Sequence, residues 1–146
     1  MNAEQLQQRI CQGIPLANHM GFRVCELDAN KITVSANQEA NINVHGTAFA
    51  GSLYSVCTLA LWGLVTARLP SHAALVLAEG QIQYRQPVLG DIVAHCEIIE
   101  QQMDGFLSDL QAQGKVRLNA TVVVPSAEGV AAQYTATVYA NYRSVG

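Results

Sequence analysis

Residues 43–68 read NVHGTAFAGSLYSVCTLALWGLVTAR, and no charged residue stands between Ala48 and Ala67. That length is about what a membrane span requires. The run also contains small and polar residues: Gly51, Ser52, Ser55, Thr58, Gly63 and Thr66. We predict one helix over residues 49–68, ended by Leu69-Pro70. A helix that is apolar on nearly every side must be buried all round, in lipid or in protein.

The remaining sequence supplies strands that could cover such a helix. Period-two alternation and turn residues predict strands over 21–29, 31–37, 72–88, 91–102, 115–124 and 130–143. A short helix is expected over 3–12 and an irregular connection over 103–114, with a short helix at 106–113. The predicted class is α+β, with an antiparallel sheet of about six strands around one central helix. No cluster of Lys or Arg flanks the apolar run, so we expect no membrane span.

The amino-acid composition indicates which kinds of binding partner to expect. The 146 residues are expected to form a single domain over 1–146, and only 13% are charged. That fraction is about half of the usual ~25%, which suggests that another subunit covers part of the surface. The net charge is -3 with eight Lys plus Arg, and no basic stripe occurs, which argues against nucleic-acid binding.

The ends and the cysteines give two further expectations. The first residues, MNAEQLQQRI, lack the apolar region of a signal peptide, so a cytoplasmic location is expected. Cysteines 11, 25, 57 and 96 form no CxxC pair and have no zinc-type spacing with histidines, which predicts buried free thiols. We expect neither a metal nor a cofactor.

Three segments resemble one family. IPLANHMGFRV, NINVHGTAFAGSLYS and IQYRQPVLGD make the chain similar to the hotdog-fold thioesterase superfamily, and closest to its YiiD carboxy-terminal type. The resemblance implies a hotdog fold, an acyl-CoA or acyl-carrier-protein thioester substrate, and a homodimer or tetramer. In that arrangement the active site lies between one subunit's helix and the other's strand.

The related phenylacetyl-CoA thioesterase type carries an Asn, then His-Gly-Gly, then an Asp on the central helix. That pattern falls here on Asn43, on Phe49-Ala50-Gly51 and on Thr58. The glycine is kept at Gly51, whereas a hydroxyl replaces the helix carboxylate. This departure puts the usual mechanism of that type in question.

Thioester hydrolysis needs a polarised carbonyl, an activated water and a held acyl chain. Gly51 at the helix N-terminus would let backbone N–H groups reach an oxyanion, or it would only permit close packing. Asn43 would orient the water or the carbonyl, or it would close its own loop. His45 is a candidate base or donor, or a surface loop histidine.

The missing carboxylate has one candidate replacement. A Thr58 hydroxyl is too weak a base and at best binds a water, whereas Glu79 lies in an apolar strand. An extended strand predicts that Glu79 points to the same face as Leu77, and we hypothesise that it is the general base. The alternatives are a salt bridge to Arg85 or Arg68, or exposure at an edge.

The expected ligand contacts come from Phe49, Ala50, Ser52 and Arg85, with Arg85 a candidate for the phosphates of a coenzyme or an ordinary solvated charge. Ser52, Ser55 and Cys57 lack the context of a nucleophile, so a covalent mechanism is disfavoured. The sequence thus predicts an acyl-thioester hydrolase. The alternatives are a non-catalytic acyl-binding hotdog subunit and a dehydratase-type hotdog enzyme.

Overall fold

The apolar run forms the central helix of the molecule. A computed structural model describes residues 1–143, and in it α4 spans Ala50–Thr66. Buried residues occupy most of its circumference, including Leu53, Val56, Leu61 and Leu64. None of the helices within residues 1–143 has both the length and the hydropathy needed to cross a bilayer. The apolar environment that α4 requires is therefore provided by the rest of the protein.

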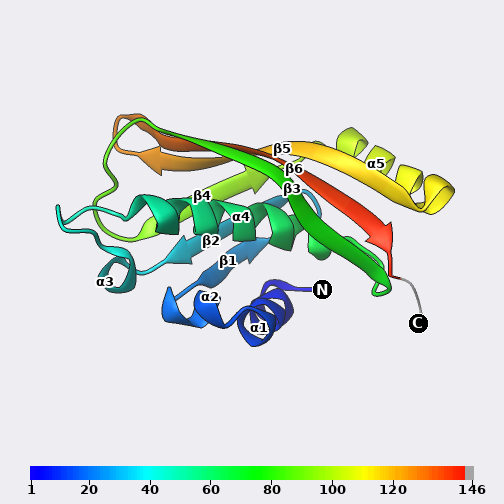
Figure 1. Cartoon of the computed structure of the whole chain (residues 1–146), viewed down its shortest axis with the longest axis horizontal. Helices are drawn as coiled ribbons and strands as arrows, with labels where there is room; N and C mark the ends of the chain where they lie inside the picture. The colour runs from blue at the N-terminus through cyan, green and yellow to red at the C-terminus, as the bar shows by residue number, and fades with distance from the viewer. Residues whose placement is uncertain (144–146) are drawn as a thin grey trace.

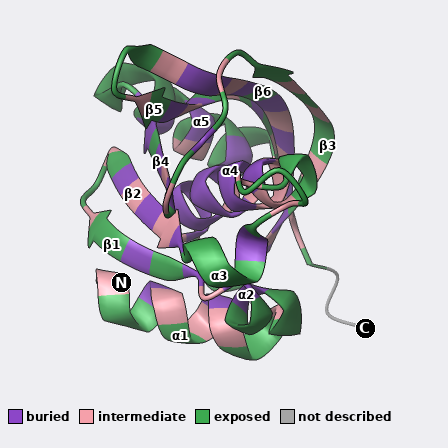
Figure 2. Ribbon diagram, turned by 90° about the vertical axis from the view of Figure 1, so that its left-hand side faces the viewer, coloured by how far each residue is buried: buried purple, intermediate pink, exposed green. Residues whose placement is uncertain are grey.

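A six-stranded antiparallel sheet wraps α4 (Figure 1). The strand order is β1-β2-β4-β5-β6-β3. The strands are β1 (Arg23–Leu27), β2 (Lys31–Ala36), β3 (Ala73–Tyr84), β4 (Ile92–Glu97), β5 (Lys115–Ser126) and β6 (Gly129–Tyr142). Figure 2 shows α4 buried in the hollow of the curved sheet. The predicted α+β class with a wrapped helix is confirmed.

Four shorter helices complete the described part of the chain. These are α1 (Ala3–Gly13), α2 (Pro15–His19), α3 (Gln38–Asn41) and α5 (Glu100–Gln113). A capping box of Asn2 and Gln5 begins α1, whose Leu6 and Ile10 are fully buried. Both contact the α4 surface at Gly63, where a Cβ would lie 3.4 Å from either side chain. The small residue therefore lets α1 pack closely against α4.

The segment after β4 differs from the prediction. The strand expected over 91–102 ends at Glu97, and the connection expected over 103–114 is a regular helix from Glu100. Met103, Phe106 and Leu110 recur at helical spacing and are all buried. Gly114 ends the helix at φ +76°, where a left-handed residue is needed. Two short helices, α2 and α3, were also not predicted.

The prediction that Glu79 and Leu77 share one face of β3 is wrong. The pairing with β6 shifts between Leu77 and Glu79, so Leu77 lies opposite the buried Val138, and the exposed Glu79 lies opposite the partly exposed Thr137. Residues that face each other across an antiparallel pair share one side of the sheet. The bulge therefore turns Glu79 to the outer side, whereas simple alternation predicts that it shares the side of Leu77.

Candidate functional site

The loop before α4 is closed by Asn43. Its Oδ1 accepts hydrogen bonds from the backbone N–H groups of His45 (2.8 Å) and Thr47 (3.2 Å). Its Nδ2 donates to Thr47 Oγ1 (3.0 Å) and to the carbonyl oxygen of Ala48 (3.3 Å). The amide thus holds the chain immediately before the helix. Its hydrogen-bonding groups are engaged by the loop itself.

The first turn of α4 presents free backbone donors. Phe49 begins the helix without a side-chain cap, its own N–H donates to the Asn41 carbonyl oxygen (2.7 Å), and Leu53 N–H donates to the Phe49 carbonyl oxygen (3.1 Å). The N–H groups of Ala50, Gly51 and Ser52 come too early to have an acceptor within the helix. They lie at the positive end of a helix of 17 residues. An oxygen that gains negative charge would be stabilised there.

Gly51 keeps this turn accessible. The ring of Phe49, which is 55% exposed, lies over the glycine. A Cβ at position 51 would lie 2.5 Å from Phe49 Cε2. Any side chain at this position would therefore displace the ring. Gly51 thus combines close packing against the Phe49 ring with an exposed position at the start of the helix.

Two cavities flank the first turn and divide the predicted ligand residues between them. The first, of about 340 Å³, lies beside α2 and α3 and is lined in part by Phe49, Gly51 and Ser52. The second, of about 300 Å³, lies beside the end of β3 and is lined in part by Ala50 and Arg85. The structure therefore brings all four predicted substrate-binding residues to the N-terminal end of α4.

His45 lies on the exposed loop, away from these two cavities. Neither cavity has it among its lining residues, whereas His19 of α2 lines the first cavity together with Gly51. The sequence reading missed His19 because it lies on a short helix that was not predicted. Its position in IPLANHMGFRV, one of the segments that carry the family resemblance, was the available signal.

Asn41 is a second residue that the sequence reading missed. Its side chain is 2% exposed and lines the first cavity. Nδ2 donates to the carbonyl oxygens of Met20 (2.9 Å) and Asn37 (2.7 Å), which fixes the orientation of the amide. Oδ1 is buried and accepts no hydrogen bond from the part of the chain that the structure describes. An acceptor of this kind is costly unless a water or a ligand donates to it.

Thr58 lies two turns into α4 and belongs to a cluster of hydroxyl groups. Its Oγ1 is 3.0 Å from the Tyr54 carbonyl oxygen and 2.8 Å from the Tyr134 hydroxyl. Because Thr58 has one hydroxyl proton, which it donates to the carbonyl, Tyr134 is the donor to Thr58. Burial raises the pKa of Tyr134 to about 12. The position that a carboxylate takes in the related type is thus part of a packed hydroxyl network.

Glu79 does not join the other predicted site residues. Its exposed carboxylate lies on the outer side of the sheet, whereas α4 occupies the inner side. The hypothesis that it is the general base rested on a shared face with Leu77, and the bulge in β3 removes that premise.

Two of the three candidate nucleophiles of α4, Ser55 and Cys57, are held in a hydrogen bond or kept protonated. Ser55 Oγ donates to the Gly51 carbonyl oxygen (2.9 Å), a common bond within helices. Cys57 and Cys96 are buried, and desolvation raises the pKa of each to about 12. Both are therefore thiols at neutral pH. All four cysteines are free, but Cys25 is exposed, so the expectation of buried thiols is only partly right.

The architecture defines the class first. One long apolar helix wrapped by a six-stranded antiparallel sheet is the hotdog fold, and the solved structures with the same shape include proteins described as a putative thioesterase and a thioesterase. The family follows from the sequence. The family model described as "Putative thioesterase (yiiD_Cterm)" matches residues 3–141. The chain belongs to this family.

Several solved structures share the fold over nearly the whole chain. A putative thioesterase from Shewanella oneidensis has 27% identity and a TM-score of 0.83, with 97% of each chain covered. A protein of unknown function from Chlorobaculum tepidum has 24% identity and a TM-score of 0.88, covering 97% of this chain and 94% of that one. A probable thioesterase from Pseudomonas aeruginosa has 18% identity and a TM-score of 0.86, covering 98% and 97%.

Proposed function

We propose that this protein hydrolyses acyl thioesters of coenzyme A or acyl carrier protein. The observation that carries the proposal is the uncapped first turn of α4, where the N–H groups of Ala50, Gly51 and Ser52 have no acceptor within the helix and these residues line two cavities. The family of thioesterases supports it. The thioester carbonyl oxygen would accept from these N–H groups, which stabilise the charge that develops when water attacks the carbonyl carbon.

The attacking water is assigned to the first cavity. Asn41 Oδ1 would accept a hydrogen bond from this water, and His19, from the same cavity, would take up its other proton as general base. The carbon–sulfur bond then breaks, and the leaving thiolate receives the proton that His19 holds. Asn43 keeps the loop in place, and His45 remains the alternative base if a second subunit brings another wall to this end of the helix.

The test is release of free thiol from acyl-CoAs of graded chain length. Gly51→Ala should lower kcat/KM by about 10- to 100-fold, because the new Cβ displaces the Phe49 ring and the carbonyl is misplaced. His19→Gln should lower kcat by about 100-fold or more.

Glu79→Gln is the matched control and should retain the wild-type rate, because this carboxylate lies on the outer side of the sheet. Thiol release that Gly51→Ala and His19→Gln leave unchanged would contradict this site, and a wild-type protein without thiol release would contradict hydrolysis.

A second candidate is an acyl-thioester binding subunit without turnover. The observation in its favour is Thr58, where the related type carries a carboxylate and this chain carries a hydroxyl bonded to Tyr134. Saturable binding of an acyl-CoA without thiol release would identify this function. The same binding with thiol release would identify the hydrolase.

We further propose that the functional unit is a homodimer joined along β3. This strand of 12 residues is at one end of the strand order, and within residues 1–143 it pairs only with β6. Long unprotected edge strands favour pairing with another chain. Two copies paired there would bring a partner strand beside α4, and the low charged fraction of 13% agrees with a covered surface.

A further inference from the structure

The sheet contains a gap between two neighbouring strands. β4 pairs with β2 from Ile92 to Glu97, but with β5 it pairs only at His95–Val123 and Cys96–Val122. Beyond Val123, β5 continues to pair with β6 as far as Ser126, after a bulge at Val124/Pro125. Pro125 has no N–H, so it cannot donate to a neighbouring strand at this end of β5. The two strands therefore separate toward the N-terminal end of β4.

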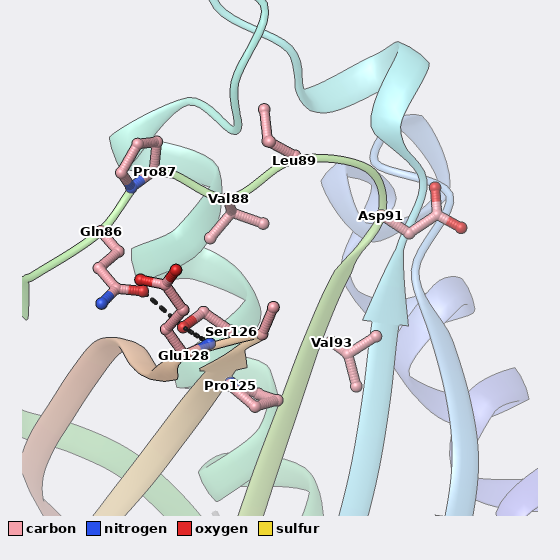
Figure 3. A pocket seen from close by; sticks show the side chains of 10 residues that line it. Gln86, Pro87, Val88, Leu89, Asp91, Val93, Pro125, Ser126 and Glu128 are labelled. Atoms are coloured by element: carbon pink, nitrogen blue, oxygen red, sulfur yellow. Dashed lines mark hydrogen bonds between the residues drawn. The ribbon is translucent and has the colours of Figure 1, made fainter.

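A groove lies between the separated strands (Figure 3). Its volume is about 710 Å³, and its floor and sides come from the end of β5, the start of β4 and the connection between β3 and β4. Apolar side chains predominate, namely Pro87, Val88, Leu89, Val93, Pro125 and Ala127. Leu89 is 79% exposed. An apolar ligand would remove this surface from water.

The groove adjoins the N-terminal end of α4. Gln86, Pro87 and Val88 line both the groove and the 300 Å³ cavity that contains Ala50. The Ala48 N–H donates to the Val88 carbonyl oxygen (2.9 Å), so the connection is attached to the residues before the helix. Gln86 Oε1 accepts from Ser126 Oγ (2.6 Å) across the groove. Residues 86–88 thus form one wall between the first turn of α4 and the groove.

Charge distinguishes the two sides of this wall. Arg85 lines the cavity at α4, and its guanidinium is exposed while it donates to Gln133 (2.7 Å) and Gln83 (3.2 Å). Asp91 and Glu128 are among the residues that line the groove, although the Asp91 carboxylate turns away to accept from the Gln38 N–H (2.8 Å), and no Lys or Arg is among the described residues that line it. Phosphate groups of a carrier would be attracted by the first side and repelled by the second.

We propose that the groove between β4 and β5 binds the acyl chain of the thioester and sets the preferred chain length. The thioester lies at the first turn of α4, the carrier phosphates lie toward Arg85, and the hydrocarbon passes the wall at Gln86–Val88 to reach Val93 and Pro125. The identity of the ligand rests on the proposed function. The placement of its apolar end rests on three observations: the gap between β4 and β5, the wall of residues 86–88 that the groove shares with the cavity at α4, and the opposite charges on the two sides of this wall.

The test uses S-ethyl-CoA and S-octyl-CoA, thioethers that cannot be hydrolysed, with binding measured by calorimetry. The wild type should bind S-octyl-CoA at least about tenfold more tightly, because the longer chain buries additional methylenes. Val93→Trp should fill the groove and remove this preference, while binding of S-ethyl-CoA changes less than about twofold. Leu89→Trp, at an exposed position that folding tolerates, should reduce the preference in the same direction.

Ile99→Trp is the matched control, because Ile99 is 63% exposed and lies outside the groove. A wild type without preference, or a preference that both groove variants retain, overturns the proposal. If the wild type still releases thiol in that case, the hydrolase function is retained and only the acyl-binding role of the groove is rejected. If Val93→Trp loses the chain-length preference but the wild type releases no thiol, the acyl-binding role of the groove is retained and the hydrolase function is rejected.

Discussion

At the scale of single residues, the site depends on where backbone and hydroxyl groups are left free. Gly51 leaves the first turn of α4 open, whereas Thr58 is already engaged by Tyr134 and by the helix backbone. The two positions lie on one helix, and the pattern of the related thioesterase type gives both a catalytic role. Their surroundings differ: Gly51 lines a cavity, whereas Thr58 contacts the buried phenol of Tyr134.

The structural role of Thr58 can be measured. Thr58→Val should lower the free energy of unfolding by about 1–3 kcal/mol, because the buried Tyr134 hydroxyl loses its acceptor. The double variant Thr58→Val with Tyr134→Phe should recover part of this loss, since both polar groups are then removed together. Urea unfolding followed by circular dichroism measures both. Equal stability of the wild type and Thr58→Val would contradict the network.

At the scale of elements, the contact between α4 and β3 depends on a small residue. Tyr54 of α4 packs edge-on against Tyr134 of β6, with ring centroids 5.2 Å apart. Its hydroxyl reaches the β3 backbone at Gly80, where a Cβ would collide with it and would lie 3.3 Å from the Tyr134 hydroxyl. Gly80 thus makes room for the phenol beneath the edge strand.

This contact gives a prediction for β3. Gly80→Ala should destabilise the protein by about 1–3 kcal/mol, because the added methyl group forces the Tyr54 ring to move within a packed interior. Gly105→Ala is the control, since a Cβ there meets nothing within 4 Å, and it should stabilise α5 by up to about 1 kcal/mol. Thermal unfolding compares the two. A Gly80→Ala variant as stable as the wild type would show that the ring has room to shift.

At the scale of the whole molecule, the unpaired side of β3 is the feature that the proposed dimer uses. Val76 lies on this strand and is 55% exposed in the isolated chain. Val76→Lys should leave the fold intact and favour the monomer, because a charged side chain on an edge strand opposes pairing. Size-exclusion chromatography with light scattering should give the mass of two chains for the wild type and of one for the variant. A wild-type monomer at micromolar concentration would exclude this dimer.

The buried thiols and the buried phenol make global stability sensitive to alkaline pH. The pKa values of Cys57, Cys96 and Tyr134 are raised to about 12 in the folded protein, chiefly by burial. The unfolded chain then releases these protons at lower pH than the folded one. The stabilisation is therefore complete below about pH 8.5 and is lost as pH rises toward 12.

Denaturant unfolding at a series of pH values measures this loss. Replacing Cys57 and Cys96 by Ala should make the decline shallower, by up to about 1.4 kcal/mol per pH unit for each thiol. The comparison uses the slope with pH, because the cavities left by the substitutions lower stability equally at every pH. An unchanged slope in the double variant would contradict the raised pKa values.

The central helix, the sheet that covers it and the family resemblance could all be read from the sequence. A charge-free run from Ala48 to Ala67 must be buried, and alternating strands with turn residues leave an antiparallel sheet as its cover. The residues at the start of α4 were likewise predictable, since Phe49 to Ser52 are consecutive and chain connectivity alone brings them together. The helix over 100–113 was partly missed, because its first residues, Glu100 to Gln102, were assigned to the preceding strand.

Only the tertiary structure decided which distant residues join that end of the helix. A register shift of one residue in β3 turned Glu79 outward, and alternation cannot reveal a bulge. The placement of His19 and Asn41 beside Gly51 depends on how α2 and α3 pack, which local patterns do not encode. The groove between β4 and β5 arises where two strands stop pairing. The sequence by itself thus determined a buried helix with an open first turn, and long-range packing decided which side chains surround it.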